Sequence, residues 1–328
     1  MKTFGMAALC GALLWLAPVS QAAAQTLSYN SGQPIAPAYE GWEEEPDGSK
    51  YFLFGYMNRN WEEEPDIPIG PANSFSPGNP DQGQPTRFLP RRNRFVFRVK
   101  VPAGWTAKEE LIWTITSPNG KTEKAWASLR EDYKVDDVVK ASETGALGAG
   151  SSSPEIRANK PPVVKVQGAK TLTAKVGQAV SIATMVTDDG IPKFRGAGLA
   201  AAAVSNRGSR TDTAVANTDA APRANRAMQP PARATVGKNV GLHLSWFVYR
   251  APSDAGVSFD PLQIKPWEDT RTGANSPWAP LWTPPEIPKD NIIPTKVTFS
   301  QPGTYVLRGL ADDGGLTGYD EVTVTVTK

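Results

Sequence analysis

Short runs in which apolar and polar residues alternate fill much of the chain beyond residue 50. The clearest early runs cover residues 51–57, 94–101, 111–116 and 124–129. A period of two turns one set of side chains into a core and the other toward water, which is typical of β-strands. Between Phe95 and Val101 the odd positions are all apolar, while Arg98 and Lys100 occupy even positions. We therefore expect the odd face of this strand to lie in a core.

Turn residues separate these runs. Ser117-Pro118-Asn119-Gly120 stands between two of them, and Asn and Gly accept the positive φ of a tight turn. We predict a β-hairpin there. After the first 24 residues, no segment keeps a helical period for more than about three turns, so the predicted class is all-β.

The length of 328 residues leaves room for two cores, because a domain typically has about 100 to 150 residues. Apolar residues nearly vanish over 142–158, where Gly and Ser accumulate. This predicts a flexible linker between an N-terminal domain, 25–141, and a C-terminal domain, 159–328, each similar to a β-sandwich. Residues 193–238 carry eight Lys or Arg, two Asp and few large apolar side chains. We expect them to form a disordered insert in the second sandwich.

Several segments of residues 159–328 carry a family resemblance. Val186-Thr187-Asp188-Asp189-Gly190, Leu244-Ser245-Trp246 and Pro302-Gly303-Thr304-Tyr305 resemble the PKD or cadherin-like branch of the Ig-like β-sandwiches, which are common in exported bacterial proteins. The resemblance implies that Trp246 lies on a middle strand and packs against Tyr305. Residues 29–137 resemble a region of uncharacterised exported bacterial proteins, through segments 55–64 and 87–95. That likeness implies export and a β fold, and supplies no chemistry.

The first 24 residues have the features of a secretory signal. Lys2 precedes an apolar stretch over 6–19, and Ala22-Ala23-Ala24 offers small residues for cleavage near Ala24 and Gln25. The apolar stretch is shorter than the roughly 20 residues of a spanning helix. We therefore expect a periplasmic or extracellular protein with no membrane span after cleavage. The one cysteine, Cys10, lies in this segment, so the mature protein has no disulfide, thiol nucleophile or Cys-ligated metal.

The charges exclude some partners and leave others open. Lys and Arg number 35 against 33 Asp and Glu, a net of +2, which gives no overall field to attract nucleic acid. A hexapeptide of Trp, three Glu, Pro and Asp occurs twice, at 42–47 and 61–66, on either side of the strand 51–57. Such flanking would bring the acidic ends together as a Ca²⁺ site or a charged docking surface. Ion pairing is the favoured alternative, with these arginines as partners: Arg59, Arg87, Arg91, Arg92 and Arg94.

A second acidic set consists of Asp188, Asp189, Asp312 and Asp313, each pair followed by Gly. Both pairs follow a predicted strand, so they can meet at one end of the sandwich and bind Ca²⁺ through oxygen. Asp-Asp-Gly is also a good turn sequence, and we favour that interpretation. Apart from Ca²⁺, no cofactor is expected.

Tryptophans supply the remaining candidate site. Trp267, Trp278 and Trp282 stand among prolines and can form a stiff aromatic platform for sugar rings or a Pro-rich partner. The alternative, which we favour, is a local core against the sandwich. Catalysis has little support, because the acidic residues lie on predicted turns and His243, the one histidine, alternates with leucines on a predicted strand. The sequence thus predicts an exported, non-enzymatic binding or scaffolding protein with a protein or glycan partner. A carbohydrate-binding module is the alternative, and a hydrolase a remote one.

Overall fold

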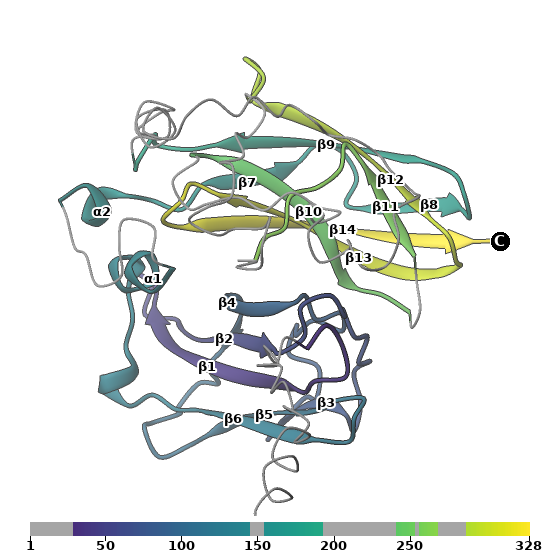
Figure 1. Cartoon of the computed structure of the whole chain (residues 1–328). Coiled ribbons are helices and arrows are strands. Elements are labelled where there is room, and N and C mark those ends of the chain that lie inside the picture. Colours follow the sequence, from purple (N-terminus) through teal and green to yellow (C-terminus); the bar gives the residue numbers. More distant parts are fainter. Residues whose placement is uncertain (1–28, 145–153, 193–240, 253–255, 268–286) are drawn as a thin grey trace, which may run out of the picture.

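Strands dominate the computed structural model, which describes residues 29–144, 154–192, 241–252, 256–267 and 287–328. They form four sheets, arranged as two pairs (Figure 1). Helical segments in the described part are a 3₁₀ turn at Glu131–Tyr133, α1 at Asp137–Thr144 and α2 at Pro154–Ala158. The all-β class is therefore confirmed. We call the described residues up to 144 the N-terminal half and those from 154 the C-terminal half.

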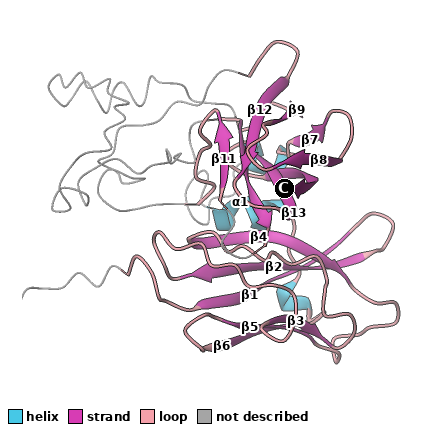
Figure 2. Cartoon of the chain, turned by 90° about the vertical axis from the view of Figure 1, so that its right-hand side faces the viewer, coloured by secondary structure: helices cyan, strands magenta, loops and turns pink. Residues whose placement is uncertain are grey.

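The N-terminal half is a pair of three-stranded antiparallel sheets. One contains β1 (Ile35–Glu44), β2 (Lys50–Asn58) and β4 (Arg91–Lys100); the other contains β3 (Asn73–Ser76), β5 (Leu111–Thr116) and β6 (Thr122–Ala127). Figure 2 shows the sheets stacked, with β4 nearest the C-terminal half. Aromatic rings from both sheets fill the space between them: the Phe97 and Trp113 rings cross nearly at right angles, 5.1 Å apart, and Phe54 lies beside both. Aromatic packing therefore supplies most of this core.

Local patterns predicted several of these strands well. The run 111–116 is β5, and the hairpin to β6 is confirmed: Ser117 N–H donates to Lys121 O and Gly120 has a φ of +83°. The run 94–101 is most of β4, and Phe97, Val99 and Val101 are buried as expected. The prediction is wrong for Phe95, which has a φ of +49° and belongs to a bulge, so it lies outside the core.

The C-terminal half is a pair of four-stranded sheets. One has the order β10 (His243–Arg250), β13 (Gly303–Asp312), β14 (Thr317–Thr327), β8 (Thr171–Lys175); the other has the order β11 (Val257–Asp260), β12 (Ile292–Phe299), β9 (Val180–Thr187), β7 (Val163–Val166). Only the β14–β8 pairing is parallel among these described strands. Residues of both sheets form one core, as in a β-sandwich.

Trp246 and Tyr305 are both buried in this core, but their arrangement differs from the expected one. β10 is an edge strand of its sheet, not a middle one. The Trp246 indole lies over Gly309, its register partner on β13, while the Tyr305 ring packs on Phe299 at 4.6 Å. The Tyr305 hydroxyl donates to Gln301 O, four residues upstream. This resembles the tyrosine corner of Ig-like sandwiches.

The predicted linker begins and ends in helix. Residues 142–144 complete α1 and residues 154–158 form α2. Ala141 of α1 is buried against Leu316 of the C-terminal half, so the helix joins the two halves by apolar contact. Residues 145–153, the predicted signal at 1–24 and the predicted insert at 193–238 lie outside the described residues, and their interpretations stay predictions. No described helix is long and apolar enough to cross a membrane.

Candidate functional site

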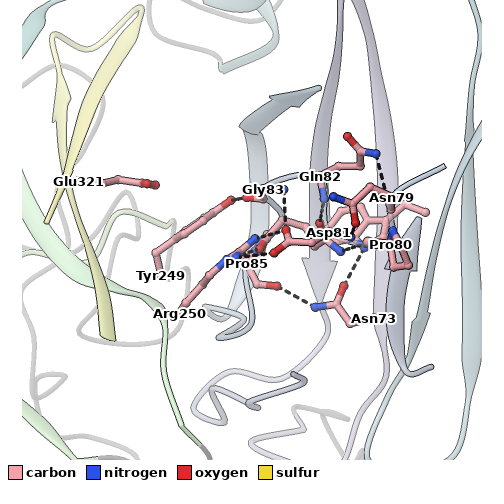
Figure 3. A network of polar contacts seen from close by, with 12 residues as sticks. Asn73, Asn79, Pro80, Asp81, Gln82, Gly83, Pro85, Tyr249, Arg250 and Glu321 are labelled. Atoms are coloured by element: carbon pink, nitrogen blue, oxygen red, sulfur yellow. Dashed lines mark hydrogen bonds and ion pairs between the residues drawn. The ribbon is translucent and has the colours of Figure 1, made fainter. Parts of the chain in front are cut away.

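A polar clamp joins the halves at the end of β10. Figure 3 shows the Arg250 guanidinium directed at Asp81, with nitrogen–oxygen distances of 2.7 and 3.0 Å. Arg250 also donates to Gln84 O, and the Tyr249 hydroxyl donates to Gly83 O at 2.6 Å. The hydrogen bond from Arg250 lowers the pKa of Asp81, so this bidentate pair stays ionised at neutral pH.

The loop that carries Asp81 and Gln84 also covers the edge of β10. Backbone N–H groups of Thr86 and Arg87 both donate to Tyr249 O, and the Ala251 N–H donates to the Thr86 hydroxyl. An edge strand has unpaired backbone groups that invite pairing with another chain. Here the N-terminal half satisfies some of them. The two halves are therefore held by backbone bonds as well as side chains.

A small apolar cluster lies beside the clamp, built from buried Leu89, Phe247, Tyr249 and Trp267. Arg308 crosses this region with a side chain that is only 4% exposed. Its guanidinium lies 3.5 Å from the Tyr249 ring and donates to Glu321 and to Val96 O on β4. Burial alone lowers the pKa of Arg308, but the surrounding tyrosines and Glu321 outweigh it, so the net direction is upward. A buried cation thus bridges the two halves.

Next to this cluster a cleft of about 470 Å³ opens between the halves. Its wall contains five arginines and two carboxylates among aromatic and aliphatic side chains. The charged residues are Arg87, Arg91, Arg92, Arg94, Arg308, Glu143 and Asp312. The aromatic residues are Tyr56, Trp61, Phe95, Phe247, Tyr249 and Trp267. The volume is typical of ligand sites, and the seven charged residues make this wall more polar than the mainly apolar lining that such sites usually have.

Carboxylates behind the wall fix three of the arginines. Arg87 forms two bonds to Asp66, at 2.6 and 2.9 Å, and Arg308 is held by Glu321. Arg92 pairs with buried Glu40 at 2.7 Å. Burial raises the pKa of Glu40, while the Arg92 charge opposes that rise. The cleft wall is therefore preorganised by ion pairs with carboxylates that do not line the cleft.

The two arginines at the mouth are held differently. Arg94 pairs at 2.8 Å with Glu143 of α1, a carboxylate with a half-exposed side chain. Arg91 donates to Arg59 O and stacks on the Trp61 ring, 3.8 Å from its centre. The Glu143 pair lies near solvent, where ion pairs are weak and easily exchanged, and Arg94 also lies 3.9 Å from the buried Glu40 carboxylate.

Of the three predicted binding tryptophans, only Trp267 is described, and it lines this cleft. Its side chain is 4% exposed and packs in the apolar cluster, with the Lys265 ammonium 5.8 Å from the ring. A ring covered in this way presents no open face to a sugar. Trp278 and Trp282 lie outside the described residues, so the platform as a whole stays a prediction.

The two Asp-Asp-Gly turns do meet at one end of the C-terminal half, where Asp188 and Asp313 line a cleft of about 540 Å³. Each carboxylate accepts backbone hydrogen bonds within its own turn: Asp188 from Gly190, Asp189 from Ile191, Asp312 from Gly314, and Asp313 from Gly315 and Leu316. Burial raises the pKa of Asp313 to about 6, against these bonds. Within the described ranges, no group of three or more Asp, Glu, His or Cys side chains is placed to hold a metal ion.

The doubled hexapeptide does not form one acidic site, contrary to the flanking argument. The first copy ends β1 and the second follows β2, and nine extended residues between them span roughly 30 Å. Ion pairing does occur, with partners that differ from copy to copy. Glu45 pairs with Arg98 at 2.5 Å and Glu44 with Lys134 at 2.7 Å, whereas Asp66 pairs with Arg87. Arg87 thus forms the kind of ion pair that the sequence predicted for it.

His243 and Trp126 line neither of the two clefts. His243 begins β10 and its Nδ1 contacts Gly241 O at 2.9 Å, as a strand-face side chain does. Trp126 was not predicted as a site residue, yet it is 52% exposed on the outer face of β6. Its neighbours Ala125 and Ala127 point into the core, so the alternation within residues 124–129 already places Trp126 outside.

Comparisons with known proteins give fold-level likeness only. No protein-family model and no curated protein sequence matches the chain. Domains 4 and 5 of the S-layer protein SbsC are similar at 9% identity and a TM-score of 0.21, covering 66% of this chain and 65% of that one. The Yersinia pseudotuberculosis adhesin InvE is similar at 11% identity and a TM-score of 0.23, and the match covers 88% of this chain and 58% of that one. The eight N-terminal Ig domains of Down Syndrome Cell Adhesion Molecule are similar at 8% identity and a TM-score of 0.22, and the match covers 89% of this chain and 27% of that one. The chain thus spans less than two thirds of each of these structures.

Proposed function

We propose that this chain is an exported, non-enzymatic binding or scaffolding protein whose ligand or partner enters the cleft between its two halves. The observation that carries the proposal is the cleft itself: about 470 Å³, lined from both halves, with convergent arginines among aromatic rings. Preformed concave sites of this volume are the usual ligand sites of proteins. The export part rests on residues 1–24.

Rigidity supports a binding role for the cleft. Its two walls are locked by the Asp81–Arg250 clamp, by Arg308 bonded to Val96 O, and by α1 packed on Leu316. A site whose walls are already fixed loses little conformational entropy when it binds. Asp66, Glu40 and Glu143 near it take part in ion pairs with arginines, an arrangement that suits binding better than proton transfer.

A cleft-filling substitution tests this proposal. Met57 lines the cleft and is partly exposed, so Met57→Trp fills the cleft without changing charge. Surface plasmon resonance of the mature protein against a panel of glycans and peptides is expected to show saturable binding that Met57→Trp removes. Val176→Trp, at an exposed turn outside the cleft, is the matched control and should bind like wild type. Equal binding by all three proteins, or chemical turnover of a bound ligand, contradicts the proposal.

Carbohydrate binding is a second candidate because of Trp126. An indole with 52% exposure on the outer face of a sheet, next to Ile112 in register, offers a stacking surface for a sugar ring. Trp126→Ala should then abolish fluorescence quenching by neutral oligosaccharides, whereas Leu262→Ala, another exposed apolar residue, should retain it. Quenching that persists in Trp126→Ala would exclude this surface.

A further inference from the structure

The mouth of the cleft has strained backbone at two positions that are not glycine. Arg91 has a φ of +63° and Phe95 a φ of +49°. Left-handed conformations cost energy for residues with a Cβ, and they persist where the surrounding structure enforces them, often at ligand sites. These two residues bracket the segment that supplies Arg92 and Arg94, and all four line the cleft.

A bulge in β4 explains how this segment is held. Tyr56 is paired with Asn93 and Phe54 with Phe97, so three residues of β4 stand opposite Gly55 alone. A Cβ on Gly55 would lie 2.2 Å from Glu40 Oε1 and 2.4 Å from Asn93 O, so only glycine fits there. The carboxylate that fixes Arg92 therefore also occupies the space that a side chain at position 55 would take. Bulges of this kind redirect side chains.

The redirected side chains combine charge with flat apolar surface. Arg94 and Arg91 stand at the opening, and the Trp61 ring supports Arg91. Three of the five arginines in the wall are paired with Asp66, Glu40 and Glu321, so an anionic ligand is expected to enter by exchange with Glu143, the exposed partner of Arg94. Glu143, half exposed, already places one carboxylate on Arg94 at 2.8 Å, which shows that the geometry accepts this group. A ligand carboxylate can replace such an exposed partner at little cost.

Resting on the proposed role of the cleft, we propose that it binds acidic glycans, with the uronic-acid carboxylate on Arg91 and Arg94 and the sugar ring against Trp61 and Phe95. A uronic acid carries its carboxylate on a rigid ring with apolar C–H faces, which matches arginines interleaved with aromatic rings. An acidic peptide presents its carboxylates on flexible side chains, whose ordering costs more entropy. The interleaving of rings and guanidinium groups thus favours the glycan.

Isothermal titration of the full chain with trigalacturonate tests the proposal, with the trigalacturonate methyl ester and hexaglutamate as comparison probes. We expect trigalacturonate to bind, the ester to bind at least tenfold more weakly, and affinity to fall with added salt. Arg94→Gln and Trp61→Ala should each weaken binding about tenfold, because each removes one contact. Arg130→Gln, an exposed arginine paired with Asp132 away from the cleft, should bind like wild type.

Specific outcomes overturn the proposal. Equal affinity for the acid and its ester removes the carboxylate from recognition, and an equal loss in Arg130→Gln shows nonspecific charge attraction. Hexaglutamate binding that is as tight and equally sensitive to Arg94→Gln refutes the glycan while leaving the cleft as the binding site. The glycan is also refuted, and the cleft is retained as the binding site, if trigalacturonate does not bind while another member of the panel binds in a way that Met57→Trp removes. Each variant is checked for folding by thermal melt, and Arg91→Gln serves as a second variant where Arg94→Gln melts early.

Discussion

Gly309 is the position where a single methyl group most directly tests the packing of the C-terminal half. A Cβ built there lies 2.7 Å from two carbons of the Trp246 indole, which is closer than real Cβ contacts come. Trp246 is 1% exposed, so its ring has no free space into which to move. Gly309 does not have the positive φ that would make glycine necessary for the backbone. The penalty of Gly309→Ala is therefore steric.

The expected magnitude depends on two opposing effects. Overpacking a filled core costs about 1 to 3 kcal/mol. Replacing glycine by alanine stiffens the unfolded chain and returns about 0.4 to 1 kcal/mol. We therefore expect Gly309→Ala to lower the free energy of unfolding by about 1 to 2 kcal/mol. Trp246→Phe loses packing as well, but it also removes an indole N–H that is buried without a hydrogen-bond partner. Its cost should be similarly modest.

Urea unfolding of the wild type, both single variants and the double variant measures the coupling between the two positions. The smaller phenyl ring leaves room for the new methyl group, so the double variant should be about 1 kcal/mol more stable than the sum of the single effects predicts. Additivity within about 0.5 kcal/mol would refute the contact between Gly309 and the Trp246 ring. A Gly309→Ala variant as stable as wild type would refute it as well.

Three further predictions concern pH, metal and chain length. Burial raises the pKa of Asp313 to about 6, above the value of about 3.9 for an unfolded chain. The native state therefore binds the proton more readily, so the free energy of unfolding should rise as pH falls from 6 to 4, by up to about 3 kcal/mol. Asp313→Asn should flatten this slope in urea midpoints, and an unchanged slope would contradict the assignment. For the metal, thermal melts in EDTA, CaCl₂ and MgCl₂ should show no calcium-specific rise in Tm. A calcium-specific rise in Tm that Asp312→Asn removes would contradict this prediction. Replacing residues 193–238 by a short Gly/Ser loop should leave the melt cooperative and its Tm within a few degrees of wild type. A larger drop in Tm would show that the insert contributes to the fold.

The sequence predicted elements whose signals are local. β5 and its hairpin follow from alternation and from a Gly at the turn, both contained within a short stretch of chain. β1 escaped prediction because it contains Pro37, Gly41 and three glutamates, which are poor strand formers. It forms because β2 offers it a partner and Trp42 is buried in the core. Pairing with a distant strand outweighs weak local propensity here.

The candidate site lay beyond the reach of local patterns. Its wall joins Arg91 and Arg94 of β4 to Tyr249 and Arg308 of the C-terminal half, more than 150 residues away. The sequence predicts the arginines of residues 87–94 as partners for the hexapeptides, yet Arg92 and Arg94 pair with Glu40 and Glu143. Alternation also failed at Phe95, because the bulge opposite Gly55 interrupts the period of two.

The two hexapeptides show why tertiary position decides function in this molecule. In the first copy Trp42 is 1% exposed and donates its indole N–H to Arg130 O, so it belongs to the N-terminal core. In the second copy Trp61 lies under Arg91 at the mouth of the cleft. The six residues are identical, so the difference comes from the path of the chain after each copy: a return into β2 in one case, and a loop into β3 of the other sheet in the second. If the cleft binds ligand, Trp61→Ala should alter binding with little effect on stability. Trp42→Ala should destabilise the fold by about 3 to 5 kcal/mol, because it removes a fully buried ring.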